Sequence, residues 1–295
     1  MFLLRRLVQF LFTLLLNAHW GFLKTGGIYQ GPLKSVCSPG LNCYACPAAL
    51  TACPIGALQH FMASVRAGIS FGQYQFGLYV IGFLGLIGSL VGRLPCGWLC
   101  PFGFLQDLLY KIPFLKLPIP RFLHYLKYLI LIIMVLVLPL FLLDTFGYGL
   151  TWFCKIICPA GTLEGALPML ALNPVLRSQI GTMFYIKLSV LIFFLLWMMV
   201  SSRPFCRTTC PLGAIYGLFN RFSLLQMTVN KEKCVKCETC YHDCPMGVRF
   251  YQSPNDSDCI RCFVCYRQSC KYGAIGYEWK GFVPQGKTHP VTSPS

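Results

Sequence analysis

The segment Arg93–Gly103 reads RLPCGWLCPFG and follows a run of apolar residues. It places Cys96 and Cys100 four residues apart, and the second cysteine comes directly before a proline. A single pair of this kind fits three readings: two small buried residues, a disulfide, or part of a metal site. Other parts of the sequence distinguish between these three readings.

The unit Cys-Pro-x-Gly occurs four times, which packing alone does not explain. Its cysteines are Cys53, Cys100, Cys158 and Cys210. The last three copies have a second cysteine four residues earlier, at Cys96, Cys154 and Cys206. Proline suits the first turn of a helix, so each Cys-Pro cysteine is expected at a helix N-terminus, where the dipole and free N–H groups stabilise a thiolate. Metals and clusters need thiolates, so the unit predicts a ligand turn.

The composition is that of a membrane protein. Of the 295 residues, 56% are hydrophobic and 12% are charged, and the mean hydropathy is +0.60, whereas soluble domains carry about 25% charged residues. The net charge of +16 could indicate nucleic-acid binding, but the basic residues are spread over the flanks of apolar runs and a cysteine-rich tail. We therefore expect no nucleic-acid partner and a mainly α, polytopic membrane protein in contact with lipid.

Four apolar runs are long enough, or nearly so, to cross a bilayer as helices. They cover residues 7–23, 74–92, 122–143 and 183–201 of a membrane domain expected over residues 1–226. Both termini and the loop between the second and third runs then share one side, which holds ten Lys and Arg residues against six on the other. The positive-inside rule places that side in the cytoplasm. We expect a multi-pass protein of the inner cell membrane with a cytoplasmic C-terminal part.

Residues 227–280 carry two cysteine runs, CVKCETCYHDCP and CIRCFVCYRQSC. In each run, three cysteines at two-residue gaps can bind one cubane cluster, while a fourth reaches the other cluster. The runs predict two [4Fe–4S] clusters in a small α+β ferredoxin-like module, followed by a polar tail at residues 281–295. The expected ligand sets are Cys234, Cys237, Cys240 and Cys270 for one cluster, and Cys244, Cys259, Cys262 and Cys265 for the other.

Two features of the runs qualify this prediction. The second run has four residues before its last cysteine, where the usual pattern has three, and Lys271 stands where proline is usual. Zinc is the alternative metal, because paired CxxC motifs also bind zinc. Eight cysteines in triplet spacing favour iron–sulfur clusters over zinc.

The predicted topology sorts the remaining ten cysteines into two groups. The pairs after the second and fourth apolar runs share the cytoplasmic side and supply enough thiols for one cluster: Cys96, Cys100, Cys206 and Cys210. The other group is expected on the outer side: Cys37, Cys43, Cys46, Cys53, Cys154 and Cys158. The outer group could bind one cluster or another metal, or form disulfides, because that compartment is oxidising.

The units CGWLCP and CRTTCP, joined to a C-terminal pair of ferredoxin motifs, resemble the membrane polyferredoxins of the NapH/NosR type. The resemblance implies four or more spans, a cytoplasmic two-cluster domain and quinol-linked electron transfer to periplasmic reductases.

Asp107 and Glu164 follow Cys-Pro-x-Gly turns near the membrane surface, where ionisable groups can accept quinol protons. A solvated helix face explains these two residues equally well. His19 and His124 are expected at opposite faces, so haem is not expected.

Two functions follow from these patterns. The first is an electron-transfer subunit that exchanges electrons between the quinone pool or a cytoplasmic donor and a partner redox enzyme; if the chain is an enzyme, it is a quinol dehydrogenase-like oxidoreductase. The second is a metal-reducing or cofactor-maturation protein that uses the CxxxCP thiols, since soft thiolates suit Cu(I).

Overall fold

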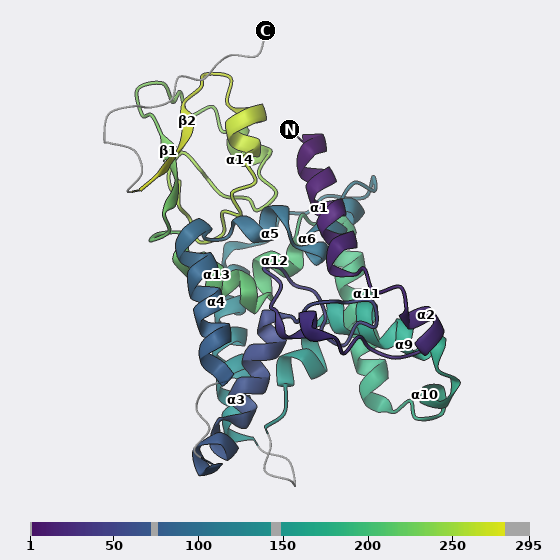
Figure 1. Ribbon diagram of the computed structural model, residues 1–295. Helices are drawn as coiled ribbons and strands as arrows, with labels where there is room; N and C mark the ends of the chain where they lie inside the picture. Colours follow the sequence, from purple (N-terminus) through teal and green to yellow (C-terminus); the bar gives the residue numbers. More distant parts are fainter. Residues whose placement is uncertain (1, 72–75, 143–148, 281–295) are drawn as a thin grey trace.

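The computed structural model describes residues 2–71, 76–142 and 149–280, and it is mainly helical (Figure 1). A bundle of helices forms the lower part of the molecule in this view, and a small cysteine-rich module with two strands forms the upper part. The polar tail predicted at residues 281–295 lies outside the described residues.

The elements follow one another in chain order. The first half contains α1 (Phe2–Leu16), α2 (Phe22–Thr25), the 3-10 turn η1 (Pro32–Ser35), α3 (Pro54–Phe71), α4 (Phe76–Val91), α5 (Leu94–Trp98) and α6 (Pro101–Leu109). One helical stretch then combines η2 (Arg121–Tyr125), α7 (Leu126–Ile130), the π-helical η3 (Leu131–Val137) and α8 (Leu138–Phe141). The π-helical turns η4 (Phe153–Ile157) and η5 (Gly161–Ala166) precede α9 (Leu167–Leu172), α10 (Pro174–Ser178), α11 (Thr182–Val200), α12 (Pro204–Thr208) and α13 (Pro211–Phe219).

The C-terminal module consists of β1 (Leu225–Val229), α14 (Thr239–His242), the π-helical turn η6 (Cys265–Ser269) and β2 (Ile275–Trp279). The strands pair antiparallel, with Leu225 opposite Trp279 and Val229 opposite Ile275. β1 begins two residues before the predicted start of the module. The strand pair joins the two ends of the module, and the backbone N–H of Leu224 donates to Ser89 O at the end of α4.

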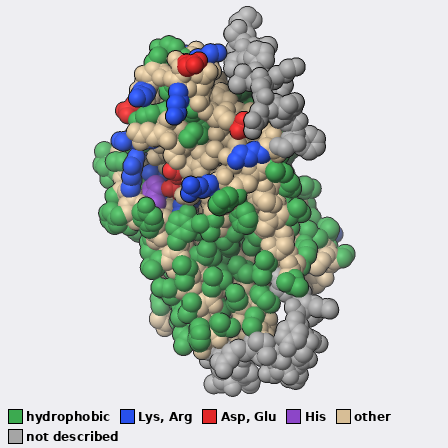
Figure 2. Space-filling view, turned by 90° about the vertical axis from the view of Figure 1, so that its left-hand side faces the viewer, with side chains coloured by type: hydrophobic (Ala, Val, Ile, Leu, Met, Phe, Trp, Pro, Cys, Tyr) green, Lys and Arg blue, Asp and Glu red, His purple; other side chains and the backbone are tan. Residues whose placement is uncertain are grey.

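Two helical stretches are long and apolar enough to cross a membrane. They cover Arg121–Phe141 and Thr182–Val200, each with a mean hydropathy of 2.2. Only 28% and 17% of their most apolar windows are buried inside the protein, so most of these side chains face outward, as in helices that contact lipid. Figure 2 shows apolar side chains over the lower part of one face, and Lys and Arg side chains gathered above them.

The other two predicted spans differ from the prediction. α4 is apolar but shorter, with Leu78–Val91 as its apolar stretch, and the predicted start at residue 74 lies outside the described residues. α1 ends at Leu16, so the run predicted over residues 7–23 is not one helix. The Asn17 side chain, which donates to Thr13 O and Asn42 Oδ1, holds the chain where it leaves α1.

Residues 17–53 consequently fold back beside the bundle. α1 is also amphipathic, because Arg5 and Gln9 are buried on the side that faces α5 and α6. The Gln9 side chain donates to Gly97 O (3.0 Å) between the two cysteines of the opening motif.

One buried carboxylate joins three helices of the bundle. Asp107 on α6 accepts from Arg203 Nε (2.7 Å) and Nη2 (2.6 Å) and from Arg5 Nη2 (2.9 Å), and Arg6 lies within 2.8 Å. Burial alone would raise the pKa of Asp107, but these guanidinium groups outweigh it and hold the pKa below its usual value. The ion pairs therefore attach α1 and the start of α12 to α6.

A second buried carboxylate attaches the C-terminal module to the bundle. Asp258 accepts from Arg93 Nη1 at the end of α4 (3.0 Å), from Lys127 on α7 and from the ring of His124 (2.5 Å). Arg93 and Lys127 are fully buried, so the module carries the countercharge for two cations of the bundle. A buried cation without its partner is costly, and this makes the attachment specific.

We expect Asp258→Asn to loosen the module from the bundle, because the change leaves Arg93 and Lys127 without their countercharge. Removing one partner of a buried ion pair costs about 3–5 kcal/mol. Thermal unfolding in detergent and limited proteolysis around residues 220–225 measure this effect. Asp243→Asn is the matched control, since Asp243 is exposed. A wild-type melting temperature for Asp258→Asn would contradict the prediction.

Candidate iron-sulfur sites

The two cysteine triplets of the module share one unusual backbone geometry. Lys236 and Glu238, on either side of Cys237, have positive φ angles of 54° and 59°. Arg261 and Phe263, on either side of Cys262, have φ angles of 48° and 58°. These left-handed residues alternate with ordinary ones, and such alternation turns backbone N–H groups toward a common concavity that binds anionic groups, including iron–sulfur clusters. The strained loops thus fit a cluster ligated by thiolates.

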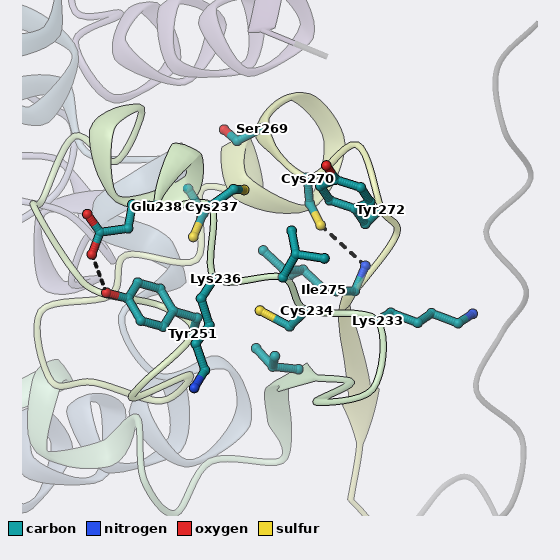
Figure 3. A pocket seen from close by; sticks show the side chains of 14 residues that line it. Lys233, Cys234, Lys236, Cys237, Glu238, Tyr251, Ser269, Cys270, Tyr272 and Ile275 are labelled. Carbon is teal, nitrogen blue, oxygen red and sulfur yellow. Dashed lines mark hydrogen bonds between the residues drawn. The ribbon is translucent and has the colours of Figure 1, made fainter.

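The eight cysteines of the module line two neighbouring cavities. The first cavity includes Cys234, Cys237, Cys240 and Cys270 among its lining residues. Figure 3 shows Cys234, Cys237 and Cys270 around this space, with Ser269 at its edge. The second cavity includes Cys244, Cys259, Cys262 and Cys265, and Cys240 borders it too. The fold therefore brings together the two sets that the sequence predicts, each with its fourth cysteine from the other run.

The extra residue of the second run is taken up by the π-helical turn η6. Residues Cys265–Ser269 form this turn, and the Cys270 N–H donates to Cys265 O (3.1 Å), a five-residue step. A π-helical turn is wider than an α-helical turn by one residue. Cys270 thereby reaches the first cavity despite the longer spacing, and the Ala274 N–H donates to its Sγ (3.3 Å).

A single metal ion needs its ligand side chains closer together than a [4Fe–4S] cluster does. Among residues 2–71, 76–142 and 149–280, no group of three or more Cys, His, Asp or Glu side chains is close enough to hold one ion. A cubane cluster spreads its four thiolates over four irons, so it does not require such close convergence. The fit to clusters rests on the sulfur donors and on the loop geometry.

The inner group, Cys96, Cys100, Cys206 and Cys210, comes together beneath the module. Cys100 and Cys210 are the N-caps of α6 and α13, and their Sγ atoms accept from the Gly103 and Gly213 N–H groups, each at 3.4 Å. These are the positions that the Cys-Pro-x-Gly unit predicts. All four thiols are nearly excluded from solvent.

Two arginines brace the inner group from opposite sides. Arg93 lies three residues before Cys96 and donates to Cys206 O (2.6 Å). Arg203 lies three residues before Cys206 and donates to Cys96 O (2.8 Å). Both side chains are fully buried. The exchange is reciprocal, and it places two permanent positive charges beside four groups that become anionic when they bind metal.

A glutamine side chain contacts the inner group directly. Gln106, six residues after Cys100, donates from Nε2 to Cys206 Sγ (3.0 Å) and is fully buried. Tyr216 holds the equivalent position after Cys210, and its buried hydroxyl has no hydrogen-bond partner among the described residues. An N–H donated to a ligand sulfur is one way in which a protein sets the potential of a cluster.

The outer group divides in two. Gln59 donates from Nε2 to Cys154 Sγ (3.0 Å), and Glu164 accepts the Cys43 N–H (2.7 Å). Gly56 and Gly161 lie three residues after Cys53 and Cys158, as Gly103 and Gly213 do after the inner N-cap cysteines. Cys37 instead forms a backbone bridge with Ala52, and the Cys46 thiol contacts Asn17 Oδ1 (3.7 Å). All 18 cysteines lie in the described residues, and each has a free thiol there.

The sequence predicts the inner and outer groups on opposite membrane faces, and in the structure the loop between Cys37 and Cys43 contacts the inner group. The Leu41 N–H donates to Cys100 Sγ (3.4 Å), and a β-carbon at Gly40 would lie 2.7 Å from Cys100 Cα. The physical reason is the early end of α1, after which the chain turns back and residues 37–53 pack against the bundle as a largely buried loop. The assignment of the two groups to opposite membrane faces stays a prediction.

The two quinone-site candidates have different environments. Asp107 is held in its arginine network, with its pKa below the usual value, so its oxygens are engaged in ion pairs. Burial raises the pKa of Glu164 to about 7, although the Cys43 N–H lowers it in part. Its contacts place Glu164 beside the outer cysteines.

Sequence reasoning missed three of the side chains that surround the cysteines, Gln59, Gln106 and Tyr216, and it named Glu164 only as a quinone-site candidate. Gln59, Gln106, Glu164 and Tyr216 each lie six residues after a Cys-Pro cysteine. Aligning the four copies over a longer window would have revealed this position as polar in every copy. The two bracing arginines share a similar signal, three residues before the first cysteine of their pairs.

We expect Gln106→Leu to lower the midpoint potential of the cluster at the inner group. The Gln106 N–H stabilises the reduced, more negative state of the cluster more than the oxidised state. For a difference of about 1 kcal/mol between the two states, its loss should lower the potential by roughly 40 mV. A redox titration followed by EPR measures the shift. Gln252→Leu, at an exposed position, is the control. An unchanged set of potentials would show that this contact does not tune a cluster.

Comparison with known proteins shows a 4Fe-4S binding domain in the bundle part of the chain. The 4Fe-4S binding domain family matches residues 51–71, 75–120 and 184–230, which contain three of the four Cys-Pro-x-Gly units. The uncharacterized protein MJ0750 of Methanocaldococcus jannaschii is 34% identical over 220 residues, 71% of this chain and 81% of that protein.

Shorter or weaker matches carry more informative names. The methylamine utilization ferredoxin-type protein MauN of Paracoccus denitrificans is 40% identical over 90 residues, 29% of this chain and 32% of that protein. The ferredoxin-type protein NapH of Haemophilus influenzae is 28% identical over 167 residues, 56% of this chain and 51% of that protein. No solved structure matches the chain. The chain therefore belongs to the same family as MJ0750, carries the 4Fe-4S binding domain, and is a distant homologue of the ferredoxin-type proteins NapH and MauN and of NosR.

Proposed function

We propose that the chain is a membrane-bound iron–sulfur electron carrier that relays electrons between the quinone pool or a cytoplasmic donor and a partner redox enzyme. Two clusters would occupy the module and at least one more the inner group. The family supports electron transport, since one relative is named a putative electron transport protein, YccM of Escherichia coli. The clusters would supply one-electron chemistry, and the chain would hold and space them.

The contact between the module and the inner group carries this proposal. Trp98, between Cys96 and Cys100, donates from Nε1 to Arg261 O (3.1 Å), next to Cys262. A β-carbon at Gly97 would lie 2.5 Å from Ile260 O, so the ligand loop of the module lies directly on the ligand turn of the bundle. Two sites joined so closely suit electron transfer without an intermediate carrier.

The bundle would exclude water from the electron-transfer path at the inner group. Phe102 and Phe205 are fully buried beside the inner group, with ring centroids 5.0 Å apart. Phe205 also contacts Phe194 on α11, at 5.2 Å. Exclusion of water strengthens the electrostatic effect of the bracing arginines on the thiolates. The chain therefore supplies thiol ligands, fixed positive charge and an apolar enclosure.

An apolar groove supports exchange with a lipid-soluble carrier such as a quinone. It has a volume of about 350 Å³ and lies where the segment before η2 crosses the end of α11. Its walls include Leu117, Pro118, Pro120, Phe193, Trp197 and Ser201. Trp197 stacks on Phe194 at 6.0 Å, and Phe194 leads through Phe205 to Cys206. The groove and the inner group are thus linked by aromatic contacts.

The proposed location is the inner cell membrane, in several passes, with the module in the cytoplasm. The two apolar helices, with their outward-facing side chains, support the membrane. The excess of basic residues on the side of the module supports the orientation. A second redox subunit would receive or supply the electrons.

We expect Cys206→Ser to remove the cluster of the inner group and to leave the two clusters of the module. Anaerobically purified protein should lose about four iron atoms per chain while the EPR signals of the module persist. A quinol analogue should reduce the module clusters of the wild type but not those of the variant. About eight iron atoms in the wild type would remove the inner site. Failure of any cluster to accept electrons from quinol, with copper bound at the CxxxCP pairs, would favour metal handling instead.

We expect Gly97→Ala to weaken the docking of the module on the bundle, because the added carbon meets the backbone of Ile260. Overpacking at a tight contact costs about 1–3 kcal/mol, so the melting temperature should fall, and electron transfer between the inner group and the module should slow. Freeze-quench EPR after quinol addition measures the transfer. Gly85→Ala is the matched control, since a β-carbon at Gly85 meets no atom within 4 Å among the described residues. Equal rates in the two variants would contradict the proposed path.

A further inference from the structure

The four Cys-Pro-x-Gly units form two pairs, and the two units of a pair contribute cysteines to the same group. The inner group is the first example. The second unit, at Cys100, and the fourth, at Cys210, share the site. The side chain six residues after Cys100 is Gln106, and it contacts the first cysteine of the other unit, Cys206, at 3.0 Å. The second unit therefore contacts its partner through the side chain at this position.

The first and third units repeat this geometry. Gln59 lies six residues after Cys53 and donates to the first cysteine of the third unit, Cys154, at 3.0 Å. The Nε2 atoms of Gln59 and Gln106 also approach the carbonyl oxygens four residues earlier, Ile55 O and Phe102 O, each at 3.4 Å. Both glutamines are fully buried. The two contacts are the same in atoms, distances and register.

The first unit lacks one cysteine that the other three have. Four residues before Cys53 stands Ala49, where the other copies have Cys96, Cys154 and Cys206. The contact that the third unit makes toward the first unit indicates which residue takes the place of the missing cysteine. Glu164, six residues after Cys158, accepts the Cys43 N–H at 2.7 Å. At the inner group, Tyr216 holds the position of Glu164.

Packing around Cys43 agrees with this assignment. A β-carbon at Gly161 would lie 3.9 Å from Cys43 Sγ, so Cys43 lies over the turn that follows Cys158. A β-carbon at Gly165 would lie 3.4 Å from Ala45 O, which fixes the loop against the same turn. Cys46 instead faces Asn17, and the Cys37 N–H donates to the Tyr79 hydroxyl (3.4 Å).

We propose that Cys43, Cys53, Cys154 and Cys158 form a four-thiol site that takes a further [4Fe–4S] cluster, with Gln59 donating to one ligand sulfur. Cys37 and Cys46 are not ligands of this site. The Thr162 hydroxyl, between Cys158 and Glu164 in the chain, is buried and has no hydrogen-bond partner among the described residues, as the Tyr216 hydroxyl has none at the inner group.

The site extends the path of the proposed function and rests on it. Leu41, two residues before Cys43, donates its N–H to Cys100 Sγ of the inner group (3.4 Å). The outer site therefore neighbours the inner site, and electrons would pass between the module and the outer site through the inner group. This order places the outer site at the end of the path away from the module.

Iron and acid-labile sulfide counts on the full-length chain in detergent test the assignment. We expect about 16 iron atoms per chain in the wild type, about 12 in Cys43→Ser, and about 16 in Cys37→Ser and Cys46→Ser. EPR signals of the module serve as the check on folding. Full iron in Cys43→Ser, or the loss of a cluster in Cys37→Ser or Cys46→Ser, would overturn the ligand set.

A second variant covers the case in which Cys43→Ser fails to fold. We expect Gln59→Leu to keep the full iron content and to lower the potential of one cluster that Gln106→Leu does not affect. No change in any potential would overturn the role of Gln59. A wild-type count near 12, with the inner cluster present, would reject the outer site and leave the proposed function standing. A wild-type count near eight iron atoms would reject both the outer site and the proposed function.

Discussion

The reciprocal bracing of two CxxxCP turns by Arg93 and Arg203 is the interaction on which the rest of the structure depends. Each arginine precedes the first cysteine of its own turn and bonds to the carbonyl oxygen of the first cysteine of the other. Each also binds a buried carboxylate, Asp258 from the module or Asp107 from α6. Arginine stays charged at any accessible pH. The two permanently charged arginines thus connect the inner group, the bundle and the module.

Such buried charges are expensive unless they are fully paired. The arrangement offsets the cost by giving every cation a carboxylate or a carbonyl oxygen, and by placing both arginines beside thiols that are anionic when they hold metal. Stability and ligation therefore support each other at the inner group. The same logic does not extend to the outer group, where the described part of the chain supplies the buried carboxyl of Glu164 and no bracing arginine.

The Cys-Pro-x-Gly unit is a local device that the chain uses four times. Proline sets the helix start, the cysteine caps it, and the glycine N–H three residues on points at the sulfur. At Cys100 and Cys210 the two distances are the same, 3.4 Å. The residue six positions on lies nearly one further helical turn along, where it can face a partner unit. One short pattern thus fixes a thiol and its hydrogen bond and, at Gln59 and Gln106, a contact to a partner unit.

The sequence by itself determined the elements that local chemistry sets: mainly helical structure, the helix starts at the Cys-Pro units, the stretches Arg121–Phe141 and Thr182–Val200, and the two sets of module cysteines that the fold gathers. These depend on periodicity, proline and short spacings, which act within a few residues. The tertiary structure alone decided the return of residues 17–53 into the bundle, the contact of Leu41 with Cys100 and the crossing arginines. Those features depend on charges and hydrogen bonds between residues up to 165 positions apart, and no local pattern encodes which distant partner a buried group will find.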